Sequence, residues 1–261
     1  YYVLPHRTLA WVISKSSLAL KDIEVEEVQL KDTVLKAREK ISDYDSTDFS
    51  SPLEELYQYL IYPLEDKLTG AKSVVIIPHK FLSYLPFQAL IRKGHFLLED
   101  YIFSYAPSAN AYFFSLQKRK EDKSTFLGLA NPFFSDPNVP PLPGSEEEVK
   151  TIAPLFPQVK VYLGKEATET AFYQYAPLYS VIHLSTHALA DEKFPLYSLI
   201  ALAEDGENDG YLLAAEVLKA PLSANLVVLS ACQTALGQYS ESEGLIGFTR
   251  SFFYAGTPTL I

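Results

Sequence analysis

The sequence has few of the residues on which disulfide scaffolds and membrane spans depend. It contains one cysteine, Cys232, which excludes an internal disulfide and favours a reducing, cytoplasmic setting. No apolar run approaches the roughly 20 residues that a membrane-spanning helix needs, and no signal-peptide pattern opens the sequence. Methionine is absent, even at position 1, and we therefore interpret the sequence as a piece of a longer chain.

Basic charge is also scarce. The chain has 22 Lys and Arg against 32 Asp and Glu, which gives a net charge of −10. Non-specific binding to nucleic acid or to an anionic membrane depends on basic patches, so we predict neither as a partner. Hydrophobic residues make up 48% of the chain, which is typical of a folded globular protein and argues against disorder.

Several catalytic signatures are missing from the sequence. There is no Gly-x-x-x-x-Gly-Lys-Ser/Thr loop, no Gly-x-Gly-x-x-Gly turn and no Gly-x-Ser-x-Gly elbow, which disfavours nucleotide-binding and α/β-hydrolase chemistry. His183 and His187 have the spacing of helical zinc proteases, but Leu184 stands where the catalytic glutamate would be, and the run has the composition of a strand. We therefore predict no metal site and no cofactor.

Short apolar runs alternate with helical patterns over residues 125–261. Strands are predicted at 126–130, 159–163, 181–187, 197–202 and 226–230, and helices at 146–156, 168–175, 214–218 and 244–254. Such alternation predicts an α/β fold with a mostly parallel sheet flanked by helices. Residues 1–120 contain a hairpin pattern, a helix over 53–68 kinked at Pro63, and a strand over 73–78. We expect them to form an N-terminal α/β half packed on the larger half, within one domain spanning 1–261.

A histidine and the cysteine end two of the predicted strands. One strand ends at His187 and the other at Cys232. In open α/β sheets, binding and catalytic sites lie just beyond the carboxyl ends of such strands. An imidazole beside a thiol forms a nucleophile and its base, because the imidazolium lowers the pKa of the thiol. We predict adjacent parallel strands with ring nitrogen and sulfur within about 4–7 Å, since dyads without substrate are often loose. A cysteine that only packs in the core is the alternative.

Several separate segments resemble the CHAT domain family, caspase-like domains usually carried behind tetratricopeptide repeats, in the clan of caspases and separases. They are residues 78–90 (PHKFLSYLPFQAL), Asn131-Pro132, Leu142-Pro143 with 146–149, His183 to His187 (HLSTH), 229–237 (LSACQTALG), Glu243-Gly244 and Ala255-Gly256. The resemblance implies a caspase-like fold for the whole chain. It also implies a domain truncated at Ile261, where the family continues into a Trp-containing strand and further helices.

The resemblance implies a cysteine endopeptidase that acts on a protein substrate, with His187 as base and Cys232 as nucleophile. The backbone N–H groups of Cys232 and Ala188 would hold the oxyanion, although Ala188 replaces the glycine that usually follows the histidine. No third, orienting acid is evident, so we predict a dyad. The alternative is a catalytically silent interaction or scaffold module that keeps the caspase-like fold, because fold does not imply function.

The substrate pocket is predicted from strand alternation. Ser230 shares a strand face with Cys232 and is expected at the floor of the first pocket. A neutral serine forms no ion pair, so we expect no strict Asp or Arg preference before the cleaved bond and favour an uncharged residue. Asp191, Glu192 and Glu243 leave a second possibility open, an acidic pocket with a preference for a basic residue.

Regulation is predicted from the segment that follows the nucleophile. Residues 238–243 (QYSESE) form a polar stretch beside Gly237 and Gly244. Because loops carry function and mobility, we expect this segment to be mobile or to cover Cys232 in the unliganded state, so that a partner controls access. The resemblance implies that tetratricopeptide repeats, in the same or another chain, are candidates for that partner. An ordinary solvated loop is the alternative.

Overall fold

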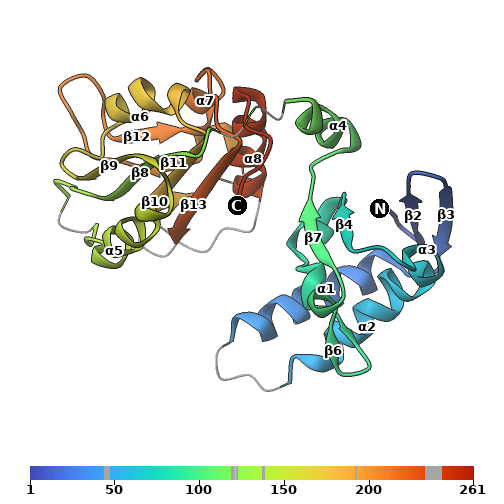
Figure 1. Cartoon of the computed structure of the whole chain (residues 1–261). Coiled ribbons are helices and arrows are strands. Elements are labelled where there is room, and N and C mark those ends of the chain that lie inside the picture. The colour runs from blue at the N-terminus through green and yellow to red at the C-terminus, as the bar shows by residue number, and fades with distance from the viewer. Residues whose placement is uncertain (44–47, 119–120, 122, 137–138, 192, 233–242) are drawn as a thin grey trace. The chain divides into compact units, whose positions relative to one another are not determined.

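The computed structural model describes residues 1–43, 48–118, 121, 123–136, 139–191, 193–232 and 243–261 (Figure 1). The secondary structure is mixed α/β. The chain divides into two compact units, Tyr1–Ala109 and Asn110–Ile261, each with its own hydrophobic core. The packing of an N-terminal half on the larger half, within a single domain, stays a prediction.

The first unit combines three helices with small sheets. An antiparallel sheet contains β1 (Tyr2–Leu4), β2 (Arg7–Ile13) and β3 (Leu18–Ile23), and the predicted hairpin is confirmed as β2–β3. The helices are α1 (Glu27–Ser42), α2 (Ser50–Leu60) and α3 (Glu65–Leu68). β4 (Ser73–Ile76) pairs with β7 (Ile102–Tyr105) in parallel, and β5 (Ile91–Arg92) pairs with β6 (His95–Phe96). Leucines from α1 and α2 form much of the core, among them Leu30, Leu53, Leu56 and Leu60.

The helix predicted over 53–68 is interrupted at its proline. α2 ends at Leu60, a 3₁₀ turn over Tyr62–Leu64 contains Pro63, and α3 begins at Glu65. Proline has no N–H to continue the helical hydrogen bonds, so the kink expected from sequence becomes a break.

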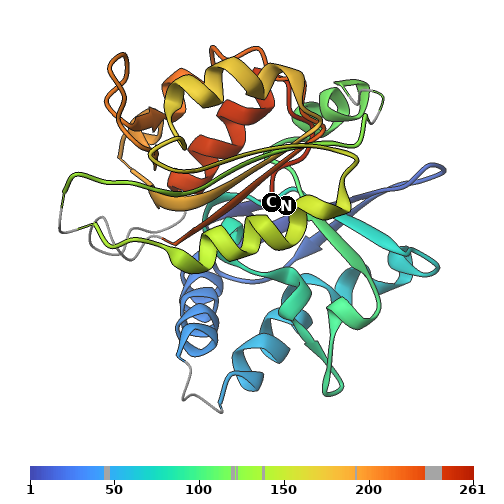
Figure 2. The ribbon, with the colours of Figure 1, turned by 60° about the vertical axis from the view of Figure 1, so that its left-hand side comes forward.

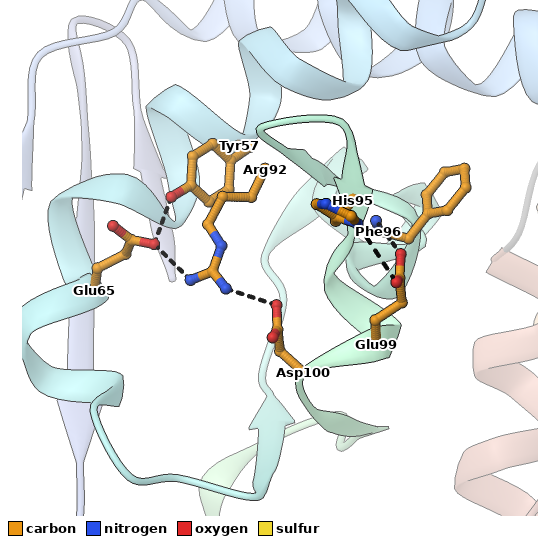
Figure 3. A network of polar contacts seen from close by, with 7 residues as sticks. All are labelled: Tyr57, Glu65, Arg92, His95, Phe96, Glu99 and Asp100. Carbon is orange, nitrogen blue, oxygen red and sulfur yellow. Dashed lines mark hydrogen bonds and ion pairs between the residues drawn. The ribbon is translucent and has the colours of Figure 1, made fainter.

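A polar network spans this break (Figure 3). Tyr57 of α2 donates to Glu65 Oε1 at 2.5 Å, and Arg92 Nη1 donates to the same oxygen at 3.0 Å. Arg92 Nη2 also donates to Asp100 Oδ2 at 2.7 Å. Burial, together with the Glu65 carboxylate, raises the pKa of Tyr57, so the phenol stays protonated and remains the donor. The network therefore links α2, α3 and β5 after the backbone helix has ended.

The second unit is built on a mixed sheet. Four parallel strands lie in the order β13–β10–β8–β9: β13 (Leu226–Cys232), β10 (Val181–Leu189), β8 (Thr125–Pro132) and β9 (Gln158–Gly164). The end of β10 also pairs with β11 (Leu199–Ala201), which pairs with β12 (Tyr211–Leu213). The strand predicted over 197–202 is therefore present but antiparallel, because no helical crossover separates it from β10.

Helices cover both faces of this sheet (Figure 2). α5 (Pro143–Ile152) lies on one face, where its Val149 packs against Phe126 and Ala130 of β8. On the other face lie α6 (Glu169–Tyr175), α7 (Ala214–Val217) and α8 (Glu243–Ala255), while α4 (Ala109–Lys118) precedes the sheet in the chain. Side chains alternate between the two faces of a strand, and Leu127 of β8 accordingly joins the core beneath α6 and α8. The central strands β8 and β10 are thus buried on both faces, as their apolar sequences require.

A buried carboxyl group joins α6 to the loop before β12. Glu169 is 2% exposed, and its Oε1 accepts a hydrogen bond from the Gly210 N–H at 2.8 Å. The pKa of Glu169 is raised to about 7, chiefly by burial; the Gly210 hydrogen bond lowers it, and the nearby carboxylates of Glu216, Asp209 and Asp205 raise it. Glu169 is therefore protonated in mildly acidic solution and ionises near neutrality.

Changing Glu169 to glutamine is expected to flatten the pH dependence of stability. The folded-state pKa lies above the ordinary value of 4.5, so folding favours the protonated form, and stability falls as the pH rises through about 7. Between pH 5 and pH 8 the parent should lose roughly 1–3 kcal/mol through this group, whereas E169Q should not. Denaturant unfolding at both pH values measures the difference. The exposed neighbour Glu166 is the control, and equal pH dependence in parent, E166Q and E169Q would contradict the prediction.

Candidate active site

The ends of β10 and β13 bring the predicted dyad positions together in the backbone. The two strands are adjacent and parallel, with His187 directly opposite Cys232 in register. The predicted adjacency of the strands is therefore confirmed. The side chain of Cys232 lies outside the described residues, so the distance between ring nitrogen and sulfur stays a prediction.

The imidazole of His187 is buried and oriented by a backbone carbonyl. The residue is 3% exposed, and its Nε2 lies 2.8 Å from the carbonyl oxygen of Pro140. A carbonyl only accepts, so Nε2 is the donor, and in the neutral ring Nδ1 holds the free lone pair. The ring of Phe134 packs beside the imidazole, with centroids 5.6 Å apart. The ring is thus held in one tautomer, with Nδ1 as the basic atom.

The orienting group was missed by the sequence analysis, which searched for a third acid. Pro140 lies in the connection between β8 and α5, and it contributes a main-chain oxygen rather than a side chain. Every residue carries such an oxygen, so no side-chain pattern could have identified it. Only the path of this connection past the end of β10 selects it.

A carboxylate lies beneath the dyad positions. Glu148 of α5 accepts hydrogen bonds at Oε2 from Ser185 Oγ at 2.7 Å and from Ser230 Oγ at 3.0 Å. Its Oε1 lies 3.2 Å from His183 Nε2, at ion-pair distance but without the alignment of a hydrogen bond. His183 is 3% exposed and lies in the core, where its Nε2 has no hydrogen-bond partner among the described residues. Glu148 was not predicted to be part of the site.

The charge state of this cluster follows from its contacts. Burial alone would raise the pKa of Glu148, but the hydrogen bonds from Ser185 and Ser230 and the nearby His183 outweigh it and hold the pKa below the ordinary value. Burial lowers the pKa of His183 more than the Glu148 carboxylate raises it. At neutral pH the cluster therefore contains an anionic carboxylate facing two hydroxyl donors and a neutral imidazole.

Two of the other predicted site residues, Ala188 and Asp191, lie at the end of β10. Ala188 is part of β10, next to His187, and is 8% exposed. Asp191 follows β10, and its carboxylate accepts a hydrogen bond from the Phe194 N–H at 2.8 Å, closing the turn toward β11. Glu243 begins α8, but its side chain lies outside the described residues. Glu192 and residues 238–242, including most of the predicted gate, also lie outside them.

A surface pocket borders the loop that holds Phe134. Aromatic residues Phe133, Phe134 and Tyr211 and acidic residues Asp136, Glu204 and Asp209 contribute to its lining. The pocket combines the loop after β8 with the loop between β11 and β12. Phe134 both lines the pocket and packs on the His187 ring, so the pocket lies beside the candidate catalytic histidine.

Over the residues that the structure describes, no three His, Cys, Asp or Glu side chains are grouped so that they could hold a metal ion. Within the same residues, no helix combines the length and the hydrophobicity required to cross a bilayer.

The fold and the strand-end pair define an α/β protein whose candidate site holds a histidine opposite a cysteine in register. The family model described as CHAT domain matches residues 50–261. The chain therefore belongs to the CHAT domain family, which confirms the resemblance seen in the sequence. CHAT domains are in general caspase-like, protease-related domains. Comparison with curated proteins gives no match.

Proposed function

We propose that this chain is a caspase-like cysteine endopeptidase in which His187 and Cys232 transfer the acyl group of a protein substrate. The observation that carries the proposal is the register of β10 and β13, which sets His187 opposite Cys232 at the carboxyl ends of two parallel strands. The fixed tautomer of His187 supports it, because a general base must present a free lone pair.

The proposed reaction proceeds through a thioester. The Cys232 thiolate attacks the carbonyl carbon of the scissile bond, and its proton is held on His187 as imidazolium. The backbone N–H groups of Cys232 and Ala188 stabilise the oxyanion of the tetrahedral intermediate. His187 then protonates the leaving amine as the C–N bond breaks. Water, deprotonated by His187, hydrolyses the thioester, which releases the carboxylate product and restores the thiol.

The substrate preference proposed from Ser230 is an uncharged residue before the cleaved bond, without strict Asp or Arg selection. Ser230 is neutral, and its hydroxyl is already donated to Glu148. The acidic residues of the pocket beside Phe134 support the second possibility, a basic residue. A positional-scanning peptide library distinguishes the two. Broad cleavage after uncharged residues is expected, and exclusive cleavage after Arg or Asp would contradict it.

The peptidase proposal is tested with peptides derived from a whole proteome. New termini should appear with the parent chain and should be absent with C232A, which loses the nucleophile and keeps nearly the same volume. The melting temperature of C232A is the control for folding. If the parent produces no new termini and its Cys232 reacts with iodoacetamide no faster than a free cysteine, the peptidase proposal fails.

The second candidate is a catalytically silent module. Its support is Ala188, which replaces the usual glycine at the position proposed to donate to the oxyanion. Alanine keeps the N–H and lies within β10, so the substitution is compatible with either function. Control of access by residues 238–243 and by a partner or repeat domain is proposed for the first candidate alone, since a silent module has no cleavage to regulate.

A further inference from the structure

The Glu148 carboxylate joins the two strands that end in His187 and Cys232. One oxygen, Oε2, accepts from Ser185 of β10 and from Ser230 of β13. These serines are direct partners in the parallel register, and each lies two residues before its dyad position. The carboxylate therefore crosses the strand pair one step below the candidate catalytic centre.

The contact also connects the strand pair to a helix. Glu148 belongs to α5, which packs on the sheet through Val149, the neighbouring residue. Its third neighbour is His183 of β10, four residues before His187. A single side chain thus connects three elements whose residues are 37 and 82 positions apart in sequence. Such a connection limits how far β10 and β13 slide past each other.

Placing a carboxylate at this position costs free energy of desolvation. Covering two strands with an apolar side chain would avoid the desolvation of a carboxylate, whose side chain here is only 35% exposed. The carboxylate is retained in a place where Oε2 accepts two hydrogen bonds and Oε1 lies 3.2 Å from the His183 ring. Charged acceptors form stronger and more directional hydrogen bonds than neutral ones, which is what alignment of two strand ends requires.

We propose that Glu148 is a positioning residue that aligns the strand ends bearing His187 and Cys232, an inference that rests on the proposed peptidase function. It acts through Ser185 and Ser230 and does not touch the substrate. The catalytic pair needs such alignment because a displacement of about 1 Å between reacting groups can cost 10²-fold in rate.

The test uses the reactivity of Cys232, the one cysteine in the sequence, toward iodoacetamide. Alkylation then reports the dyad directly and requires no substrate. E148A should lower the alkylation rate constant and kcat by about tenfold or more, with KM within about twofold of the parent. E148Q keeps an acceptor oxygen but loses the charge, and it should recover only part of that loss. The S185A/S230A variant removes both donors; its alkylation rate constant should match that of E148A, with no further loss when E148A is added.

The control is E147A, since Glu147 is an exposed neighbour on α5, and its rates should equal those of the parent. An unchanged or higher alkylation rate in folded E148A overturns the inference. So does a rate loss in E148A/S185A/S230A that equals the sum of the losses in E148A and in S185A/S230A. If E148A does not fold, S185A/S230A serves as the same test, and parent rates in that variant overturn the inference.

The H187A variant distinguishes a failure of this inference from a failure of the proposed function. If H187A alkylates as fast as the parent, the proposed function fails. If H187A is slow and E148A is not, only the role of Glu148 fails.

Discussion

Replacing His187 with alanine is expected to lower kcat/KM for peptide cleavage by roughly 10³-fold or more. The imidazole both raises the thiolate fraction of Cys232 and protonates the leaving amine, so its loss affects attack and bond cleavage together. Water reaches this site poorly as a substitute base, because the position of His187 is only 3% exposed. Initial rates on a peptide found with the proteome-derived library measure the effect.

The matched control for this prediction is H95A. His95 is an exposed histidine of the first unit, and its ring lies 3.6 Å from Glu99. Its replacement should leave kcat/KM within about twofold of the parent, as is usual for surface positions. A dyad acts as a unit, so H187A/C232A should be no slower than C232A alone. If H187A retains more than about a tenth of parental kcat/KM, His187 is not the general base.

Replacing Gly210 with alanine is expected to destabilise the second unit by roughly 2–4 kcal/mol. Gly210 has φ +86°, a backbone conformation that costs a residue with Cβ about 1–2 kcal/mol. An added Cβ would also lie 2.8 Å from the Leu202 carbonyl oxygen, which is backbone and cannot rotate away. The Gly210 N–H that binds Glu169 would move with the strained loop. A fall in melting temperature of roughly 5–10 °C is the expected result.

Gly206 in the same loop is the matched control. Its φ lies outside the left-handed region, and an added Cβ would have no heavy atom within 4 Å. G206A should therefore change the melting temperature by no more than about 2 °C. Equal destabilisation by G206A and G210A would mean that the loop responds to any added side chain, and that the positive φ and close contacts of Gly210 are not the cause.

Much of the second unit could be predicted from the sequence because its strands are short apolar runs, of which the central β8 and β10 are buried on both faces. Each of the runs at 126–130, 159–163, 181–187 and 226–230 falls within an observed parallel strand. Buried parallel strands have nearly continuous apolar sequences, which distinguishes them from the amphipathic helices between them. The adjacency of the strands that end in His187 and Cys232 was also predicted, whereas the order of all four strands came only from the structure.

Two features of the fold could not be predicted in this way. β11 has the composition of the parallel strands but runs antiparallel, since orientation depends on the connection and not on the strand sequence. The helix pattern over 53–68 remains periodic through Pro63, although α2 ends before it and α3 begins after it. In both cases a local pattern described the element, while its neighbours determined its direction or length.

The sequence by itself determined the chemical groups of the candidate site and the strands that bear them. The thiol of Cys232 and the imidazole of His187 stand at the ends of apolar runs, and composition is enough to place such runs in a sheet. Only the tertiary structure decided which groups orient them. Pro140 lies 47 residues from His187, and Glu148 lies 82 residues from Ser230. A carbonyl or carboxylate becomes an orienting group through its position in space, because hydrogen bonds act within about 3 Å however far apart the partners are in sequence.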